Sequence, residues 1–278
     1  MDASSIKTKT RLFACISTVK ELGDRAMQLS EALGLRRGEM AALIGAGGKT
    51  TTLFRLAREL RDQGSKVLVT TTTKMFKPNK PHVDRLFLVE QLAALREACA
   101  DIAAPVVIGA GAAINEEGKL LGIPPDWLDA MNQSSQFDAI LVEADGAASR
   151  LFKIPGDGEP VIPASSQLTI WLMAIGVLDK PLDPAWIHRA ERATALLQVD
   201  EKEMMTEERI VELVQHPAGC WKGIPAASRR VAVINQADSP EQVERAQSLA
   251  QKLLGCGVER TVITSYAGQE PVKEVVQS

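Results

Sequence analysis

The chain has 278 residues, of which 32 are Lys or Arg and 35 are Asp or Glu, so its formal net charge is −3. This balance lacks the positive excess that binding to a phosphate backbone usually requires, and we expect no general nucleic-acid binding. Apolar residues make up 45% of the chain but are often interrupted by charges, which excludes a disordered chain and a membrane span of about 20 residues.

The N-terminal region shows neither a secretory signal nor a cysteine framework. The apolar stretch 12–16 is shorter than the apolar core of about 7–15 residues that a signal peptide needs. The four cysteines are far apart and form no CxxC pair, which disfavours a zinc site or a set of disulfides. We therefore expect a cytoplasmic protein with reduced thiols.

Apolar residues recur at helical spacing from Val19 to Leu33, and the pattern ends before Gly34. This periodicity predicts an amphipathic helix. We interpret residues 1–38 as an N-terminal helical segment that precedes the main domain.

Short apolar runs then alternate with helical patterns along residues 39–278. Nearly continuous runs of Val, Ile and Leu are typical of parallel strands that are buried on both faces. Their alternation with helices predicts an α/β fold, a three-layer α/β/α arrangement with a mainly parallel sheet. The Pro- and Gly-rich stretch 152–166 begins a possible smaller elaboration around 152–228. We expect strands at 40–44, 66–69, 86–89, 106–108, 139–142, 168–175, 231–234 and 261–263, and helices at 50–61, 91–100 and 240–254.

A glycine-rich loop separates the first predicted strand from the helix at 50–61. Backbone amides in such a loop form an anion site, Lys49 can reach the terminal phosphates of a nucleotide, and the Thr50 hydroxyl can bind Mg²⁺. The usual pattern G-x-x-x-x-G-K-[ST] would need glycine at Leu43, so the loop is similar instead to the shorter G-x-x-G-K-T-T loop of the Mur-ligase type. We expect the phosphates of GTP or ATP to bind Gly45, Ala46, Gly47, Gly48, Lys49, Thr50 and Thr51.

Four threonines, Thr70 to Thr73, follow the strand at 66–69. Threonine suits a strand by propensity alone, which is one interpretation. The other is that hydroxyls at the carboxyl end of the strand bind Mg²⁺ or fix a water, with Thr72 as the expected metal ligand.

Two carboxylates, Glu143 and Asp145, follow the strand at 139–142. P-loop NTPases use an acid in this place to hold the magnesium shell and to polarise the attacking water. Residues two apart on an extended strand point to the same side, so both acids could approach one ion. We expect Lys49, Glu143 and Asp145 to be catalytic and Thr50, Thr72, Glu143 and Asp145 to hold Mg²⁺.

The strand at 231–234 ends in Asn235-Gln236-Ala237-Asp238. This resembles the N-K-x-D motif with which GTP-binding proteins read guanine, although Gln236 replaces the lysine. Asn235 and Asp238 are therefore candidate base-binding residues. The alternative is that Asp238 caps the helix that begins near Pro240.

Taken together, these motifs resemble the YqeC-type family of accessory proteins for selenium-dependent hydroxylases. The resemblance is carried, in order, by residues 43–51, 67–75, 142–147, 159–163, His188-Arg189 and 235–238. It implies a P-loop NTPase-like fold and a role in maturing selenium-dependent molybdenum hydroxylases, with such an enzyme or its maturation factors as partner.

Three functional hypotheses follow. The first is a Mg²⁺-dependent nucleotide-binding protein that hydrolyses GTP or ATP slowly, since no obvious arginine finger exists and Arg150 and Arg189 are only possible substitutes. The second is a Mur-like ligase or kinase that transfers the γ-phosphate to a small acidic or selenium-containing acceptor. The third is a nucleotide-sensing chaperone that does not hydrolyse nucleotide.

Overall fold

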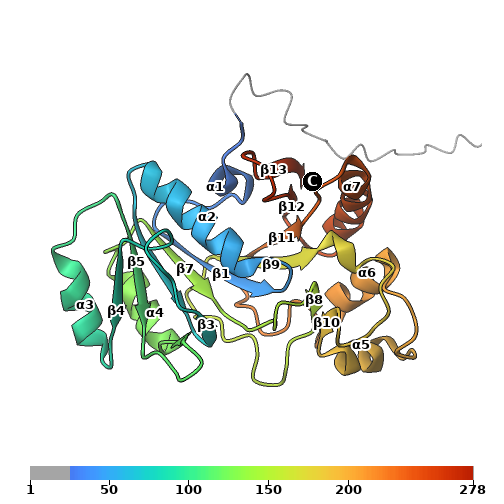
Figure 1. The fold of residues 1–278 in the computed structure, drawn as a ribbon, viewed down its shortest axis with the longest axis horizontal. Helices are drawn as coiled ribbons and strands as arrows, with labels where there is room; N and C mark the ends of the chain where they lie inside the picture. Colours follow the sequence, from blue (N-terminus) through green and yellow to red (C-terminus); the bar gives the residue numbers. More distant parts are fainter. Residues whose placement is uncertain (1–25, 278) are drawn as a thin grey trace, which may run out of the picture.

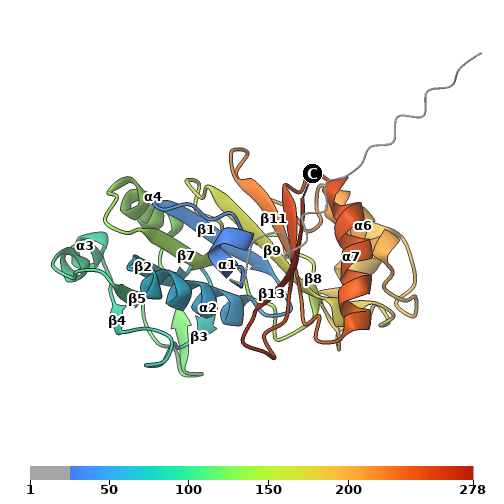
Figure 2. The same ribbon diagram turned by 90° about the horizontal axis from the view of Figure 1, so that it is seen from above.

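The computed structural model describes residues 26–277, which form three layers with a central sheet between two layers of helices (Figures 1 and 2). The predicted three-layer α/β fold with a mainly parallel sheet is confirmed. No helix within residues 26–277 is long and apolar enough to cross a membrane.

Nine strands form the main sheet, and all neighbouring pairs are parallel except the last two strands of the chain. The first strand, β1, lies in the middle of the sheet, directly beside β7. In spatial order the strands are β13 (Val272–Gln277), β12 (Arg260–Thr264), β11 (Arg229–Asn235), β9 (Leu168–Ala174), β1 (Glu39–Gly45), β7 (Ala139–Glu143), β2 (Lys66–Thr71), β5 (Val106–Gly111) and β4 (Arg85–Leu88).

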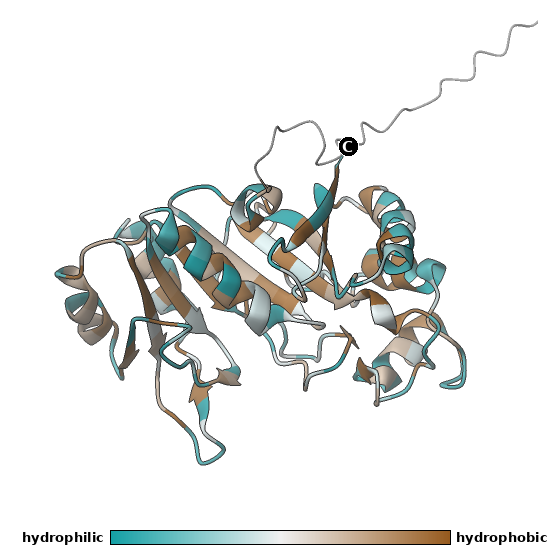
Figure 3. Ribbon diagram, turned by 45° about the horizontal axis from the view of Figure 1, so that its top comes forward, coloured by the Kyte–Doolittle hydropathy of each residue, from teal (hydrophilic) through white to brown (hydrophobic). Residues whose placement is uncertain are grey.

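The strands are apolar because helices cover both faces of the sheet. Residues Ala41 and Leu43 of β1 pack toward α1 (Leu29–Ala32) and α2 (Lys49–Asp62), whereas Ala42 and Ile44 belong to a core on the other face. Figure 3 shows the hydrophobic colours concentrated along the strands and on one side of each long helix. The second face is covered by α3 (Leu92–Ala100), α4 (Pro125–Gln133), α5 (Ala190–Leu197), α6 (Glu207–Gln215) and α7 (Pro240–Leu254).

Two small sheets follow the carboxyl ends of the central strands. The strands β3 (Lys74–Phe76) and β6 (Lys119–Leu121) pair antiparallel beyond β2 and β5. Beyond β7, the strands β8 (Phe152–Lys153) and β10 (Ile187–His188) pair in parallel. A short 3₁₀ helix, Ile175–Val177, follows β9. The small sheets therefore flank the edge at which ligands of α/β proteins bind.

The structure confirms all eight predicted strands and the three predicted helices of the main domain, with ends that differ by up to three residues. The predicted helix at 19–33 lies partly outside the described residues, and its described part contains a helix over Leu29–Ala32 only. The sequence did not reveal β3, β6, β8, β10 and β13, nor α4, α5 and α6. Residues 152–228 contain β8, β9, β10, α5 and α6, so the proposed elaboration includes one strand of the main sheet.

Candidate functional site

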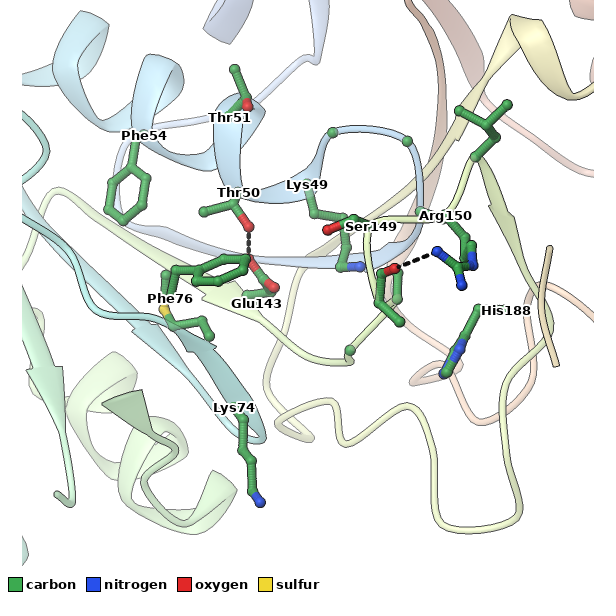
Figure 4. Close-up of a pocket in the computed structure, with 18 of the residues that line it drawn as sticks. Lys49, Thr50, Thr51, Phe54, Lys74, Phe76, Glu143, Ser149, Arg150 and His188 are labelled. Atoms are coloured by element: carbon green, nitrogen blue, oxygen red, sulfur yellow. Dashed lines mark hydrogen bonds between the residues drawn. The ribbon is translucent and has the colours of Figure 1, made fainter. Parts of the chain in front are cut away.

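A cleft of about 910 Å³ opens at the carboxyl edge of the main sheet, and the glycine loop forms part of its wall. Among the described residues that line it, six are Lys or Arg and two are Glu, so the cleft favours anionic ligands. Figure 4 shows Phe54 and Phe76 at one end, Arg150 and His188 at the other, and Lys49 and Thr50 between them.

The glycine loop is closely packed against the neighbouring strand. Gly47 and Gly48 have φ of +72° and +127°, which favour glycine over residues with a side chain. A Cβ atom at Gly47 would also collide with the backbone of Ala174, and one at Gly48 with the Asn235 amide. The loop sequence is therefore required both by its backbone conformation and by close packing.

Acceptors within the protein bind only the first three backbone amides of the loop. The amides of Gly45, Ala46 and Gly47 donate to Asp145 Oδ2 (3.1 Å), Leu172 O (2.9 Å) and Arg150 O (3.0 Å). The next four amides, of residues 48–51, donate to no other group within residues 26–277, as expected for the first turn of a helix. Because residues 46–51 line the cleft, these free amides form an anion site there.

Lys49 is buried beneath the loop with a side-chain exposure of 4%. Its ammonium donates to Gly45 O at 2.5 Å and lies 3.1 Å from Asp145 Oδ1. Asp145 does not line the cleft, so the structure places this acid behind Lys49 and not at the ligand surface. These two contacts fix the position of the Lys49 ammonium, so its positive charge stays beneath the anion site.

A chain of alternating charges continues from Asp145 into the small β8–β10 sheet. Lys153 Nζ lies 3.1 Å from Asp145 Oδ2 and 2.6 Å from Glu159 Oε2, and Arg189 Nη1 lies 2.7 Å from the same Glu159 oxygen. Burial opposes ionisation of Glu159, but its hydrogen bonds with Arg189 and Lys153 prevail and lower its pKa to about 2. Glu159 is therefore ionised at neutral pH and neutralises two cations near the cleft.

Glu143 lines the cleft beside the helix that carries Lys49. Its Oε2 accepts a hydrogen bond of 2.8 Å from the Thr50 hydroxyl, drawn as a dashed line in Figure 4. Burial raises the pKa of Glu143, while the charge of Lys49 and the Thr50 hydrogen bond act in the opposite direction. A buried acid whose charge is costly, next to an anion site, is a common feature of functional centres.

Three hydroxyls of the threonine run donate hydrogen bonds to backbone carbonyls of neighbouring segments. Thr71 donates to Glu143 O (2.8 Å) and Thr72 donates to Val161 O (2.6 Å). Thr70 donates to Ala110 O at 2.8 Å. Thr72, the residue predicted to bind Mg²⁺, does not line the cleft.

The end of β11 contacts the glycine loop directly. Asn235 is buried, and its amide donates to Gly47 O (2.7 Å) while its carbonyl oxygen accepts from the Thr264 hydroxyl (2.9 Å). Gln236, with φ of +62°, lines the cleft. Asp238 lies outside the cleft and accepts a hydrogen bond from Ser265, and the cap of α7 is Ser239. The interpretation of Asp238 as the helix cap is therefore wrong.

The lining also contains Ala148 and Ser149, which had no recognisable sequence signal, and the already noted Arg150 and His188. Ala148 and Ser149 line the cleft on a turn where both have positive φ, a strained conformation that often marks functional segments. Arg150 also lines the cleft, but its guanidinium donates to Pro184 O at 2.6 Å. His188 lines the same end, and burial together with the charge of Arg189 lowers its pKa.

The residues present fit a magnesium ion that also uses ligand oxygens. Thr50 and Glu143 offer a hydroxyl and a carboxylate, which are the hard oxygen donors that Mg²⁺ prefers. Within residues 26–277, no cluster of three or more His, Cys, Asp or Glu could hold a metal without such help. The protein donors thus suit an ion that arrives with a phosphate ligand.

A family model and a curated relative agree with the family resemblance of the sequence motifs. The family described as "YqeC protein" matches residues 41–191. Uncharacterized protein YqeC of Escherichia coli (strain K12) is 32% identical over 235 residues, which cover 84% of this chain and 90% of that protein. Among solved structures, chloroplast FtsY from Physcomitrella patens gives a TM-score of 0.43 at 14% identity, covering 92% of this chain and 68% of that one.

Proposed function

The chain belongs to the YqeC protein family, and we propose that it binds GTP or ATP together with Mg²⁺ and hydrolyses the nucleotide slowly. The observation that carries this proposal is the anion site of four free amides, at residues 48–51, above a buried lysine. Amides at a helix N-terminus and a fixed ammonium together complement a polyphosphate without a high net charge on the protein.

In this proposal the amides of residues 48–51 hold the phosphates, and Lys49 neutralises the charge that grows on the β–γ bridge as the bond breaks. Asp145 is a positioning residue, because it touches Lys49 and the Gly45 amide and is not exposed to the cleft. It keeps the ammonium beneath the loop.

We propose that Thr50 and Glu143 hold Mg²⁺. When bound, the ion would neutralise negative charge on the phosphates. Glu143 is also the acid that can accept a hydrogen bond from the attacking water, since it lines the cleft whereas Asp145 does not. Slow turnover is expected because both candidate arginine fingers are engaged elsewhere, Arg150 with Pro184 O and Arg189 with Glu159.

The family resemblance supports a role as accessory factor in the maturation of selenium-dependent molybdenum hydroxylases. A nucleotide cycle suits such a role, since bound and released states can differ in affinity for a client enzyme. Nucleotide-dependent association with such a hydroxylase is the measurement that tests this part of the proposal. Association that is equal with and without nucleotide would contradict it.

Calorimetric titration of GTP and ATP, each with Mg²⁺, tests nucleotide binding. Replacing Lys49 with Ala should weaken both nucleotides by about 100-fold, because a buried charge-assisted contact is lost. If Asp238 reads guanine, Asp238→Ala should weaken GTP by about 2–3 kcal/mol and leave ATP unchanged. Equal losses for both nucleotides would mean that the base is recognised elsewhere, with Gln236 as the neighbouring candidate in the cleft.

One further variant serves as a control, and another tests the proposed metal ligand. Lys77→Ala changes an exposed lysine outside the cleft and should bind like the unchanged protein. Thr50→Ala keeps the Lys49–Asp145 ion pair and should lose the dependence of binding on Mg²⁺. Hydrolysis in the unchanged protein no faster than in Lys49→Ala would refute the NTPase part and leave the non-hydrolysing chaperone.

A further inference from the structure

The cleft extends well past the groups that the proposed nucleotide uses. Glu143 and Thr50 mark the position of the metal and of the γ-phosphate, yet the cleft continues from them to Phe54 and Phe76 (Figure 4). This end of the cleft is formed by the start of α2 and by the small β3–β6 sheet, and the proposed function assigns nothing to it.

The order of the strands separates this end from the predicted base-binding residues. Seen from β1, the strand β11 with Gln236 lies on one side of the sheet, whereas β7, β2 and the following β3 lie on the other. A nucleotide with its phosphates on the glycine loop and its base near Gln236 therefore leaves the β3–β6 end open beside its γ-phosphate.

One face of the β3–β6 sheet has an unusual composition. Lys74 and Phe76 alternate with the buried Met75, and Phe76 pairs with Lys119, so Lys74, Phe76 and Lys119 share one face. All three line the cleft, as does the edge of Met75. Phe76 is 65% exposed, although the opposite face of the same sheet buries Met75 and Leu120 in the core. An exposed phenyl ring between two lysines offers an apolar surface and positive charge at the same place.

The wall of α2 adds a second aromatic surface and another cation. The rings of Phe54 and His82 are stacked at 4.2 Å, with 12° between their planes, and both line the cleft. Arg58 also belongs to the lining, and its charge acts on His82. The charge of Lys74 acts on the exposed Glu117 without a direct ion pair among the described residues. Lys119 pairs with Glu117 at 2.8 Å on the surface, where such pairs contribute little.

From this juxtaposition we infer that the β3–β6 end of the cleft is a second binding site, for a planar heteroaromatic molecule that carries a phosphate group. The ring lies against Phe76 and His82, which the buried Phe54 supports by stacking, and Arg58, Lys74 and Lys119 neutralise the phosphate. The inference rests on the proposed function, because it names the substrate class that would lie next to the γ-phosphate. It favours a role in which the nucleotide acts on a second small molecule.

Flavin mononucleotide is a suitable probe, since it combines a planar heteroaromatic ring with a phosphate and its fluorescence falls on stacking. The full chain is titrated with it in the presence of Mg²⁺ and a non-hydrolysable analogue of GTP or ATP. We expect saturation below about 1 mM, and binding at least about 10-fold weaker for riboflavin and for ribose 5-phosphate, which each lack one half of the probe. Pyridoxine 5′-phosphate is a second probe of the same class.

Matched variants locate the site. Phe76→Ala should weaken the probe by about 10-fold or more, whereas Leu88→Ala, which removes another exposed apolar side chain, should not. Lys74→Ala should weaken it more than Lys77→Ala, because Lys77 does not line the cleft. None of these four changes should alter nucleotide affinity.

Two results would overturn the inference. If neither probe saturates, the β3–β6 end is not a site for this class of molecule. If the nucleotide analogue displaces the probe and Phe76→Ala weakens both equally, this end holds the nucleotide base. Probe binding that persists in a protein unable to bind either nucleotide would instead contradict the proposed function and leave the second site in place.

Discussion

At the scale of single residues, the two acids after β7 have different surroundings despite being two positions apart. Asp145 is enclosed by Lys49, Lys153 and the Gly45 amide, whereas Glu143 lines the cleft and accepts from Thr50. The sequence predicted that both would meet one ion. It could not separate them because the lysine between Asp145 and Glu159 comes from β8, a strand of two residues with no sequence signal of its own.

Replacing Glu143 with Gln should stabilise the ligand-free protein while removing its Mg²⁺-dependent binding of nucleotide. Burial raises the pKa of Glu143, so the unfolded chain ionises at lower pH than the folded one and ionisation costs stability. We expect the variant to melt about 2–4 °C higher than the unchanged protein at neutral to alkaline pH, if about 1 kcal/mol is recovered.

This gain has a defined pH dependence, which thermal unfolding at a series of pH values can measure. It should be absent below the usual glutamate pKa of about 4.3, grow as the pH rises toward the raised pKa of the folded protein, and then remain constant. Glu116→Gln, at an exposed glutamate, serves as control and should change nothing. A Glu143→Gln protein that melts lower than the unchanged protein at every pH contradicts the account.

At the scale of elements, the glycine loop depends on two strands that lie far from it in the sequence. β1 and α2 supply the loop, β9 packs against Gly47, and Asn235 at the end of β11 binds its carbonyl. The sequence predicted the strand, the loop and the helix because glycine and helical periodicity are local signals. The sequence motif suggested that Asn235 binds the nucleotide base. Its contact with Gly47 was not predicted, because a contact across 188 residues leaves no local pattern.

Replacing Asn235 with Ala should destabilise the fold and loosen the loop together. The Gly47 carbonyl and the Thr264 hydroxyl would lose buried partners, at a cost of about 2 kcal/mol in the free energy of unfolding. Urea unfolding measures this loss, and calorimetry should show weaker binding of both nucleotides. Asn79→Ala, on an exposed segment, is the matched control. Full stability with selective loss of GTP would mean that Asn235 contacts the base and does not hold the loop.

At the scale of the whole molecule, regular alternation made the central sheet predictable, and the flanking pieces were not. The inner strands of the main sheet, such as β2, are buried on both faces and read as apolar runs. The edge strand β13 alternates with an exposed residue, and β3, β6, β8 and β10 are only two or three residues long. These short pairs form one end of the cleft each. The sequence therefore located the glycine loop but not the surfaces on either side of the cleft that it lines.

Nucleotide binding should stabilise the entire fold, because the site joins β1, α2, β7 and β11. At 100 times its dissociation constant a ligand adds about 2.7 kcal/mol, which corresponds to a rise in melting temperature of about 5–10 °C for a chain of this size. Differential scanning fluorimetry with Mg²⁺ and nucleotide measures the shift. Lys49→Ala, with binding weakened about 100-fold, should reduce the shift to about 1–2 °C, and a shift of equal size in that variant would place the nucleotide outside the glycine loop.

The hydrogen bond between Asn235 and Gly47 joins two parts of the chain that are synthesised at different times. The glycine loop leaves the ribosome early, but its carbonyl acquires a partner only after β11 has been translated, 188 residues later. A nascent chain that ends before β11 contains the whole phosphate motif and still lacks the strand that fixes it. The contact that holds the Gly47 carbonyl therefore forms only after residue 235 has been synthesised.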